Sequence, residues 1–80
     1  MDQSTLESKL VKTFITAFEC DFNQQQIAAM RYKVDPAWDS FGHMSLMTQI
    51  CIDFSVELTF EEMISLLSFE DCLNFLMRDR

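Results

Sequence analysis

The sequence predicts a small all-α domain. Its 80 residues contain one glycine and one proline, too few for the frequent turns of a β-rich chain. Apolar residues recur at spacings of three and four along several segments, as on one face of a helix. Ser, Thr or Asp precedes most of these segments, where it can cap the free N–H groups of a first turn. A chain of this length forms a modest core, so we expect residues 1–80 to make one domain.

The first predicted helix covers residues 5–18. Ser4 and Glu7 fit a capping box, in which each side chain bonds the backbone N–H of the other residue. The apolar stripe that follows consists of Leu6, Leu10, Val11, Phe14, Ile15 and Phe18. Lys9, Lys12 and Thr13 fall mostly off this stripe.

Residues 19–38 form a long connection, which we expect to be ordered. Residues 23–30 can make a short helix, whereas Pro36 disfavours helix at Asp35. The apolar residues expected to pack this connection down are Ile27, Met30, Tyr32, Val34 and Trp38.

The second long helix is predicted from Ser40 to about Ser55, with Asp39 and Ser40 both able to cap it. The inward face is predicted to contain Leu46, Met47, Ile50 and Phe54, with His43 pointing the same way. The opposite side contains Phe41, Met44, Thr48 and Ile52, where a surface helix ordinarily has charges. We predict that this apolar side binds a partner; the alternative is that another part of the domain covers it.

Two shorter helices follow. Thr59 can cap a brief helix with Glu61 and Glu62 in its first turn, and Ser68 can cap the last one with help from Asp71. The buried contacts of the brief helix are predicted to be Met63, Ile64 and Leu67. The inward stripe of the last helix is predicted to be Phe69, Cys72, Leu73, Leu76 and Met77. Arg78 and Arg80 place positive charge at its C-terminal end, as the helix dipole favours.

Composition argues against several classes of function. The net charge of −7 opposes the neutralisation of phosphates, so we expect no nucleic-acid binding. No stretch approaches the roughly 18 apolar residues of a membrane span, and the first ten residues lack the apolar run of a signal peptide. The three cysteines include no CxxC pair, which favours reduced, core-type thiols. We therefore expect a cytoplasmic protein without a membrane span.

The sequence gives little support to two further hypotheses, a catalytic serine–histidine pair and a Cu(I) site. Ser40 and His43 lie three residues apart on a predicted helix and can meet, but no glycine-rich turn precedes the serine. The soft ligands of a Cu(I) site recur along the same helix as His43, Met44, Met47 and Cys51. One helix cannot turn all four toward one ion, so we predict no metal site. Because no glycine-rich turn precedes Ser40, we also predict no catalysis by the chain itself.

Three segments carry a resemblance to a known family. Residues 38–44, Trp-Asp-Ser-Phe-Gly-His-Met, resemble the Asp-Ser-Leu motif of acyl carrier and peptidyl carrier domains, in the Trp-Asp-Ser-Leu-Gly-His form of natural-product pathways. Residues 53–59 are similar to the family's acidic-Phe-Gly-Val-Glu-Ile-Pro segment. Residues 68–71 open the last helix where the family has its own. The resemblance extends over essentially the whole chain.

This resemblance implies a four-helix bundle with a long first loop and a short third helix. It implies that Ser40 carries a 4′-phosphopantetheine arm, derived from coenzyme A, whose thiol holds acyl, aminoacyl or polyketide groups as thioesters. Asp39 would help to dock the phosphopantetheinyl transferase and assist the metal that this enzyme uses. Phe41, Met44 and Thr48 would contact the loading enzyme and later synthase, transferase or tailoring enzymes, and His43 would support packing beneath the arm. The carrier is expected to be a non-catalytic monomer.

The chain also departs from the family pattern. Phe41 replaces the usual Leu, and Ser55 replaces a Gly. Ser45, Cys51 and Ile52 stand where fatty-acid carriers have a row of carboxylates. These departures favour nonribosomal peptide, polyketide or related pathways. The alternatives are a carrier for fatty-acid synthesis and an unmodified helical adaptor that binds a partner through Phe41, Met44 and Thr48.

Overall fold

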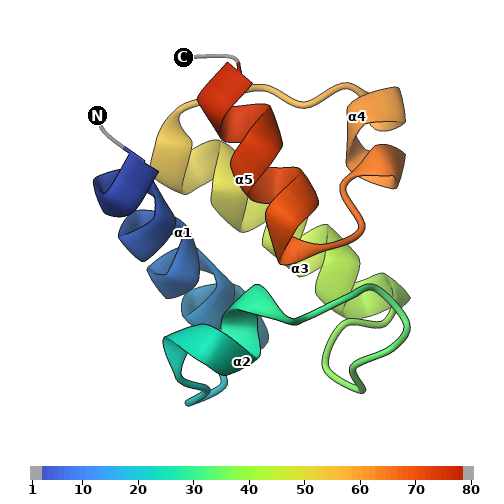
Figure 1. The fold of residues 1–80 in the computed structure, drawn as a ribbon. Helices are drawn as coiled ribbons and strands as arrows, with labels where there is room; N and C mark the ends of the chain where they lie inside the picture. Colours follow the sequence, from blue (N-terminus) through green and yellow to red (C-terminus); the bar gives the residue numbers. More distant parts are fainter. Residues whose placement is uncertain (1–2, 79–80) are drawn as a thin grey trace.

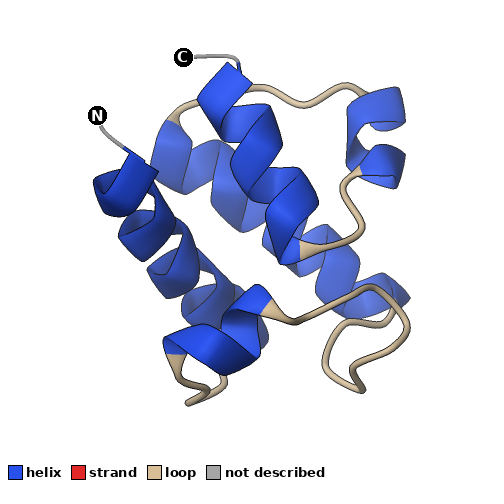
Figure 2. Ribbon diagram, in the orientation of Figure 1, coloured by secondary structure: helices blue, strands red, loops and turns tan. Residues whose placement is uncertain are grey.

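The computed structural model describes residues 3–78 and confirms the all-α prediction (Figures 1 and 2). Within that range the only β-type pairing is an isolated bridge between Arg31 and Ser68. The helices are α1 (Gln3–Phe18), α2 (Gln24–Ala28), α3 (Ser40–Phe54), α4 (Phe60–Ser65) and α5 (Phe69–Arg78). None of the helices between residues 3 and 78 is long and apolar enough to cross a membrane. Arg80 lies outside the described residues.

Most of the predicted caps are confirmed. Thr59 caps α4 as predicted and forms a complete capping box with Glu62. Asn23, for which no cap was predicted, forms a complete capping box with Gln26 at the start of α2. The hydroxyl of Ser68 accepts a hydrogen bond from the N–H of Asp71 at 3.0 Å. The short Asp71 side chain reaches back to the N–H of Leu67 rather than to that of Ser68.

The prediction for the start of α1 is wrong. Ser4 lies inside the helix, so it is not the N-cap residue. The carboxylate of Glu7 instead accepts a hydrogen bond from the side chain of Gln24 at 3.3 Å, which links α1 to α2.

The core lies between α1, α3 and α5, with the loop before α3 closing one end (Figure 1). The predicted inner face of α3 is confirmed, because all four of its apolar residues are buried. Phe14 is the aromatic centre of the core, with edge-on contacts to Phe18, Trp38 and Phe69 at centroid distances of 5.2–5.8 Å. Burial of these side chains supplies the main driving force for folding.

Several burial predictions are wrong. Thr13, predicted off the apolar stripe, is buried, and its hydroxyl is satisfied there by hydrogen bonds to the Lys9 carbonyl and to Asp53. In the brief helix α4 Met63 is half-buried. Leu66, the C-cap residue directly after α4, is buried in place of the predicted Ile64 and Leu67. The residues predicted to be buried that are instead exposed are Val34, Ile64, Leu67 and Met77.

The loop between α2 and α3 is ordered, as predicted, by contacts with the start of α5. The N–H of Tyr32 donates to the carbonyl of Leu67 at 2.9 Å, and the N–H of Phe69 donates to the carbonyl of Met30 at 3.3 Å. Trp38 is fully buried at the end of the loop. These anchors fix the point at which the chain enters α3.

Candidate functional site at the start of α3

Of the two residues that the sequence allowed as caps of this helix, Asp39 is the cap and Ser40 is not. Asp39 is the N-cap in extended conformation, and its carboxylate accepts a hydrogen bond from the N–H of Gly42 at 2.8 Å. Ser40 is the first residue of α3 and is exposed. Its hydroxyl is not used for capping, so it remains at the surface of the positive end of a 15-residue helix.

Gly42 allows the loop to lie directly against α3. A Cβ atom at this position would stand 2.3 Å from the carbonyl oxygen of Ala37 and 3.1 Å from the ring of Phe18. Such a separation from a backbone oxygen is far inside van der Waals contact. The close approach therefore requires glycine, and it sets the position of Asp39 and Ser40.

His43 is a structural bridge. The indole N–H of Trp38 donates to its Nδ1 at 2.9 Å, and its Nε2 lies 2.7 Å from the carbonyl oxygen of Met63. Because indole nitrogen is only a donor, Nδ1 must be unprotonated, and Nε2–H then donates to Met63. The ring is 8% exposed and links the loop, α3 and α4. Both ring nitrogens have partners other than Ser40, so the structure does not form the serine–histidine pair.

Tyr32 lies beside the serine. Its hydroxyl oxygen is 3.2 Å from the hydroxyl oxygen of Ser40, and either atom can donate. The Tyr32 ring packs against the His43 ring with 5.0 Å between centroids. Sequence analysis placed Tyr32 only in the loop packing; no helical spacing relates residues 32 and 40, so the contact had no sequence signal.

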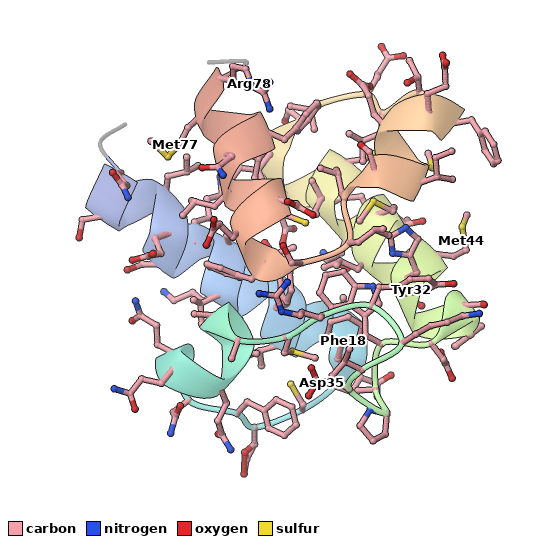
Figure 3. All side chains as sticks on the ribbon, turned by 45° about the vertical axis from the view of Figure 1, so that its right-hand side comes forward. Phe18, Tyr32, Asp35, Met44, Met77 and Arg78 are labelled. Atoms are coloured by element: carbon pink, nitrogen blue, oxygen red, sulfur yellow. The ribbon has the colours of Figure 1, made fainter. Side chains whose placement is uncertain are left out.

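The predicted partner-binding residues are all on the surface of α3. Phe41 is 82% exposed, Met44 54% and Ile52 65%, and Thr48 is also exposed. Figure 3 shows Met44 projecting outward from α3. No other described residue covers them, so the alternative of an internally covered face is wrong. Phe60 and Ile64 of α4 are also exposed apolar residues, which sequence analysis missed.

A shallow groove runs between α1 and the exposed side of α3. Its volume is about 410 Å³, and a second hollow of about 300 Å³ continues toward the loop and Asp39. Phe41 and Ser45 line both hollows. The second hollow is lined by Asp39 and Phe41, the two chain neighbours of Ser40, but not by Ser40 itself. The groove combines hydroxyl groups with apolar side chains.

The single carboxylate of α3 does not reach the exposed face. One oxygen of Asp53 accepts a hydrogen bond from Thr13 at 2.8 Å, and the other accepts one from Gln49 at 2.9 Å. Thr13 belongs to α1, whereas Gln49 lies one turn earlier on α3 itself. The outward side of α3 consequently presents no charged group from its own helix.

The soft-ligand residues do not converge. His43 and Met47 are buried, Met44 is exposed, and Cys51 is half-buried. Among residues 3–78 no cluster of three or more His, Cys, Asp or Glu side chains is placed to hold a metal ion.

All three cysteines are free thiols in the structure. Cys72 is the core-type thiol that the sequence predicted: burial raises its pKa, and the nearby carboxylate of Asp71 adds to the effect. Cys20 and Cys51 are half-buried.

The sequence was compared with models of known protein families and with curated proteins. No model of a known protein family matches the sequence, and no curated protein matches it. The functional interpretation therefore depends on the residues and their geometry.

Proposed function

We propose that this protein is an acyl- or peptidyl-type carrier that holds reaction intermediates on a 4′-phosphopantetheine arm attached to Ser40. The observation that carries the proposal is the exposed Ser40 hydroxyl at the first position of α3, directly after the capping Asp39. Unpaired N–H groups and the dipole at a helix start favour a phosphate there. The Asp-Ser motif resembles the attachment motif of carrier domains.

The arrangement of the helices is consistent with this class. Three longer helices, the brief α4 and an ordered loop before α3 correspond to a four-helix carrier bundle if α2 is counted as part of the first loop. Ser40 is then the first residue of the second long helix, α3, directly after the loop. The exposed position leaves its hydroxyl accessible to a transferase.

Attachment requires a transferase and coenzyme A. The Ser40 oxygen forms a bond to phosphorus while the phosphoanhydride bond of coenzyme A breaks, the nucleotide half leaves, and the serine proton passes to the transferase or to solvent. The attached group supplies a terminal thiol for thioester formation. The protein supplies a rigid attachment point and a contact face, and tethering raises the local concentration of the intermediate at each partner enzyme.

The uncharged contact face favours specialised biosynthesis over fatty-acid synthesis. Asp53, the only acidic residue of α3, is bound to Thr13 and Gln49. Recognition by partner enzymes would then depend on the exposed Phe41, Met44 and Ile52 more than on charge. We expect partners from nonribosomal peptide, polyketide or related pathways, with small and transient interfaces.

Intact mass spectrometry tests the attachment. The protein is incubated with coenzyme A and a broad-specificity phosphopantetheinyl transferase, alongside the variants Ser40→Ala and Ser45→Ala. Wild type and Ser45→Ala should gain the mass of one arm, whereas Ser40→Ala should gain none. Ser45 is a matched control because it lies half-buried on the same helix. No gain in the wild type, or an equal gain in Ser40→Ala, would refute the proposal.

An unmodified adaptor is the second candidate, favoured by the 82% exposure of Phe41. An adaptor would use the same face without any group on Ser40. Ser40→Ala would then keep full activity in cells, while Met44→Glu would lose it. A carrier should lose activity with either change.

A further inference from the structure

Tyr32 is held rigidly beside the proposed attachment point. Its backbone N–H is bonded to the carbonyl of Leu67 at 2.9 Å, and its ring packs on His43, which is itself bonded on both sides. The phenol oxygen stands 3.2 Å from the Ser40 oxygen. Figure 3 shows Tyr32 beside the first part of α3. The position of this hydroxyl is therefore set by contacts that do not depend on Ser40.

Lys33 adds a positive charge next to this phenol. Its backbone has a positive φ of 64°, and its N–H donates to the carbonyl of Trp38 at 2.8 Å, so the turn is fixed. The ammonium group lies 5.6 Å from the centroid of the Tyr32 ring. The chain has a net charge of −7, and the capping carboxylate of Asp39 directly precedes Ser40. Lys33 therefore brings positive charge to a region where the nearest capping group is negative.

We propose that Tyr32 and Lys33 hold the phosphate that joins the arm to Ser40. This inference rests on the proposed function, since it concerns the phosphodiester that attachment creates. Esterification removes the hydrogen from the Ser40 oxygen, so Tyr32 becomes the only donor of the pair. Its hydroxyl then donates to the ester oxygen or to a neighbouring phosphoryl oxygen.

Lys33 offsets the charge that attachment adds. A phosphodiester carries one negative charge and has only acceptor atoms, and here it would stand close to the Asp39 carboxylate. The Lys33 ammonium can turn from the Tyr32 ring to a phosphoryl oxygen and make a charge-assisted hydrogen bond. Together the two side chains would orient the first bonds of the arm, while the distal part stays free to enter partner enzymes.

The test uses phosphorus-31 NMR of the fully modified protein, with complete modification verified by intact mass. The variants are Tyr32→Phe, which removes only the hydroxyl, and Lys33→Gln. The control is Lys9→Gln, because the Lys9 ammonium lies 4.9 Å from the ring centroid of Phe54, at the other end of α3. An α-helix of this length places that end about 20 Å from Ser40. Circular dichroism verifies that each variant is folded.

Tyr32→Phe and Lys33→Gln should each shift the phosphorus resonance, and Lys9→Gln should leave it at the wild-type position. Added salt should move the wild-type resonance toward that of Lys33→Gln, because an exposed ion pair is screened. Equal resonances in the wild type, Tyr32→Phe and Lys33→Gln would overturn this inference and leave the proposed function intact. Failure of the wild type to accept the arm would overturn both.

Discussion

The two faces of α3 are both apolar, yet only one of them is used for folding. On the inner face Leu46, Met47 and Ile50 are completely buried. On the outer face Phe41 and Ile52 are more than half exposed. Apolar composition alone therefore does not separate a buried face from an exposed one. The difference lies in what the rest of the chain places against each face.

The polar groups of the helix show the same division. His43 is hydrogen-bonded to Trp38 of the loop and to Met63 of α4. Asp53 accepts hydrogen bonds from Thr13 of α1 and from Gln49 of α3 itself. The outer face has no charged residue of α3. An exposed apolar surface is costly for solubility, which is the physical ground for the recognition role proposed for this face.

A matched pair of isoleucines gives the largest expected difference between the faces. Ile50→Ala removes a fully buried side chain and should lower the free energy of unfolding by about 2–5 kcal/mol. Ile52→Ala removes the same atoms from a 65% exposed side chain and should change it by less than about 0.5 kcal/mol. Urea denaturation of both variants measures the contrast, and similar losses in the two would contradict it.

Gly42→Ala tests the junction between the loop and the inner face. The added methyl group meets the Ala37 carbonyl, so the loop must shift, at a cost of about 1–3 kcal/mol. Thermal unfolding measures the loss. Ser45→Ala, one turn further along α3, is the control and should stay near wild type; a Gly42→Ala variant as stable as this control would mean that the loop does not lie so close.

Ser55→Gly tests the end of α3, where the two faces meet the next connection. Ser55 has a φ of 53° and is the left-handed C-cap, a conformation that glycine adopts without steric penalty. The substitution should raise the free energy of unfolding by about 0.5–1 kcal/mol. Ser55→Ala, which keeps a Cβ atom, should give no such gain. A loss of stability with Ser55→Gly would show that the serine side chain has a role of its own.

Met44→Glu should have the smallest effect on stability and a clear effect on function. The side chain is 54% exposed, so helicity by circular dichroism and the unfolding midpoint should remain near wild type. The carboxylate places a charge in the contact face, so turnover with partner enzymes should fall. Ser8→Glu, at an exposed site on α1, is the control for added charge. Unchanged turnover with Met44→Glu would exclude Met44 from the contact surface.

Local patterns predicted the long helices well. The caps Asp39, Thr59 and Ser68 act within one turn, so three or four neighbouring residues are sufficient to identify them. The same pattern failed at Ser4, because a serine near a helix start can also lie inside the first turn. The inner face of α3 was predictable because a 15-residue helix repeats its apolar spacing several times.

Short and irregular segments were less predictable. The six residues of α4 contain less than two turns, so spacing could not decide whether Ile64 or Leu66 is buried. Thr13 is buried, and the carboxylate that bonds its hydroxyl, Asp53, lies 40 positions away in the sequence. The contact between Tyr32 and Ser40 depends on a loop that is fixed by the start of α5. None of these long-range contacts has a signal in local sequence.

The most direct test of the account locates the arm on the chain. Trypsin is unsuitable, because no Lys or Arg occurs between Lys33 and Arg78 and all serines of α3 would stay in one peptide. Chymotrypsin cleaves after aromatic residues, so cleavage after Trp38 gives peptides that begin at Asp39. Tandem mass spectrometry of protein treated with the transferase and coenzyme A should place the added mass on Ser40. Added mass at any other residue, or none, would contradict the account.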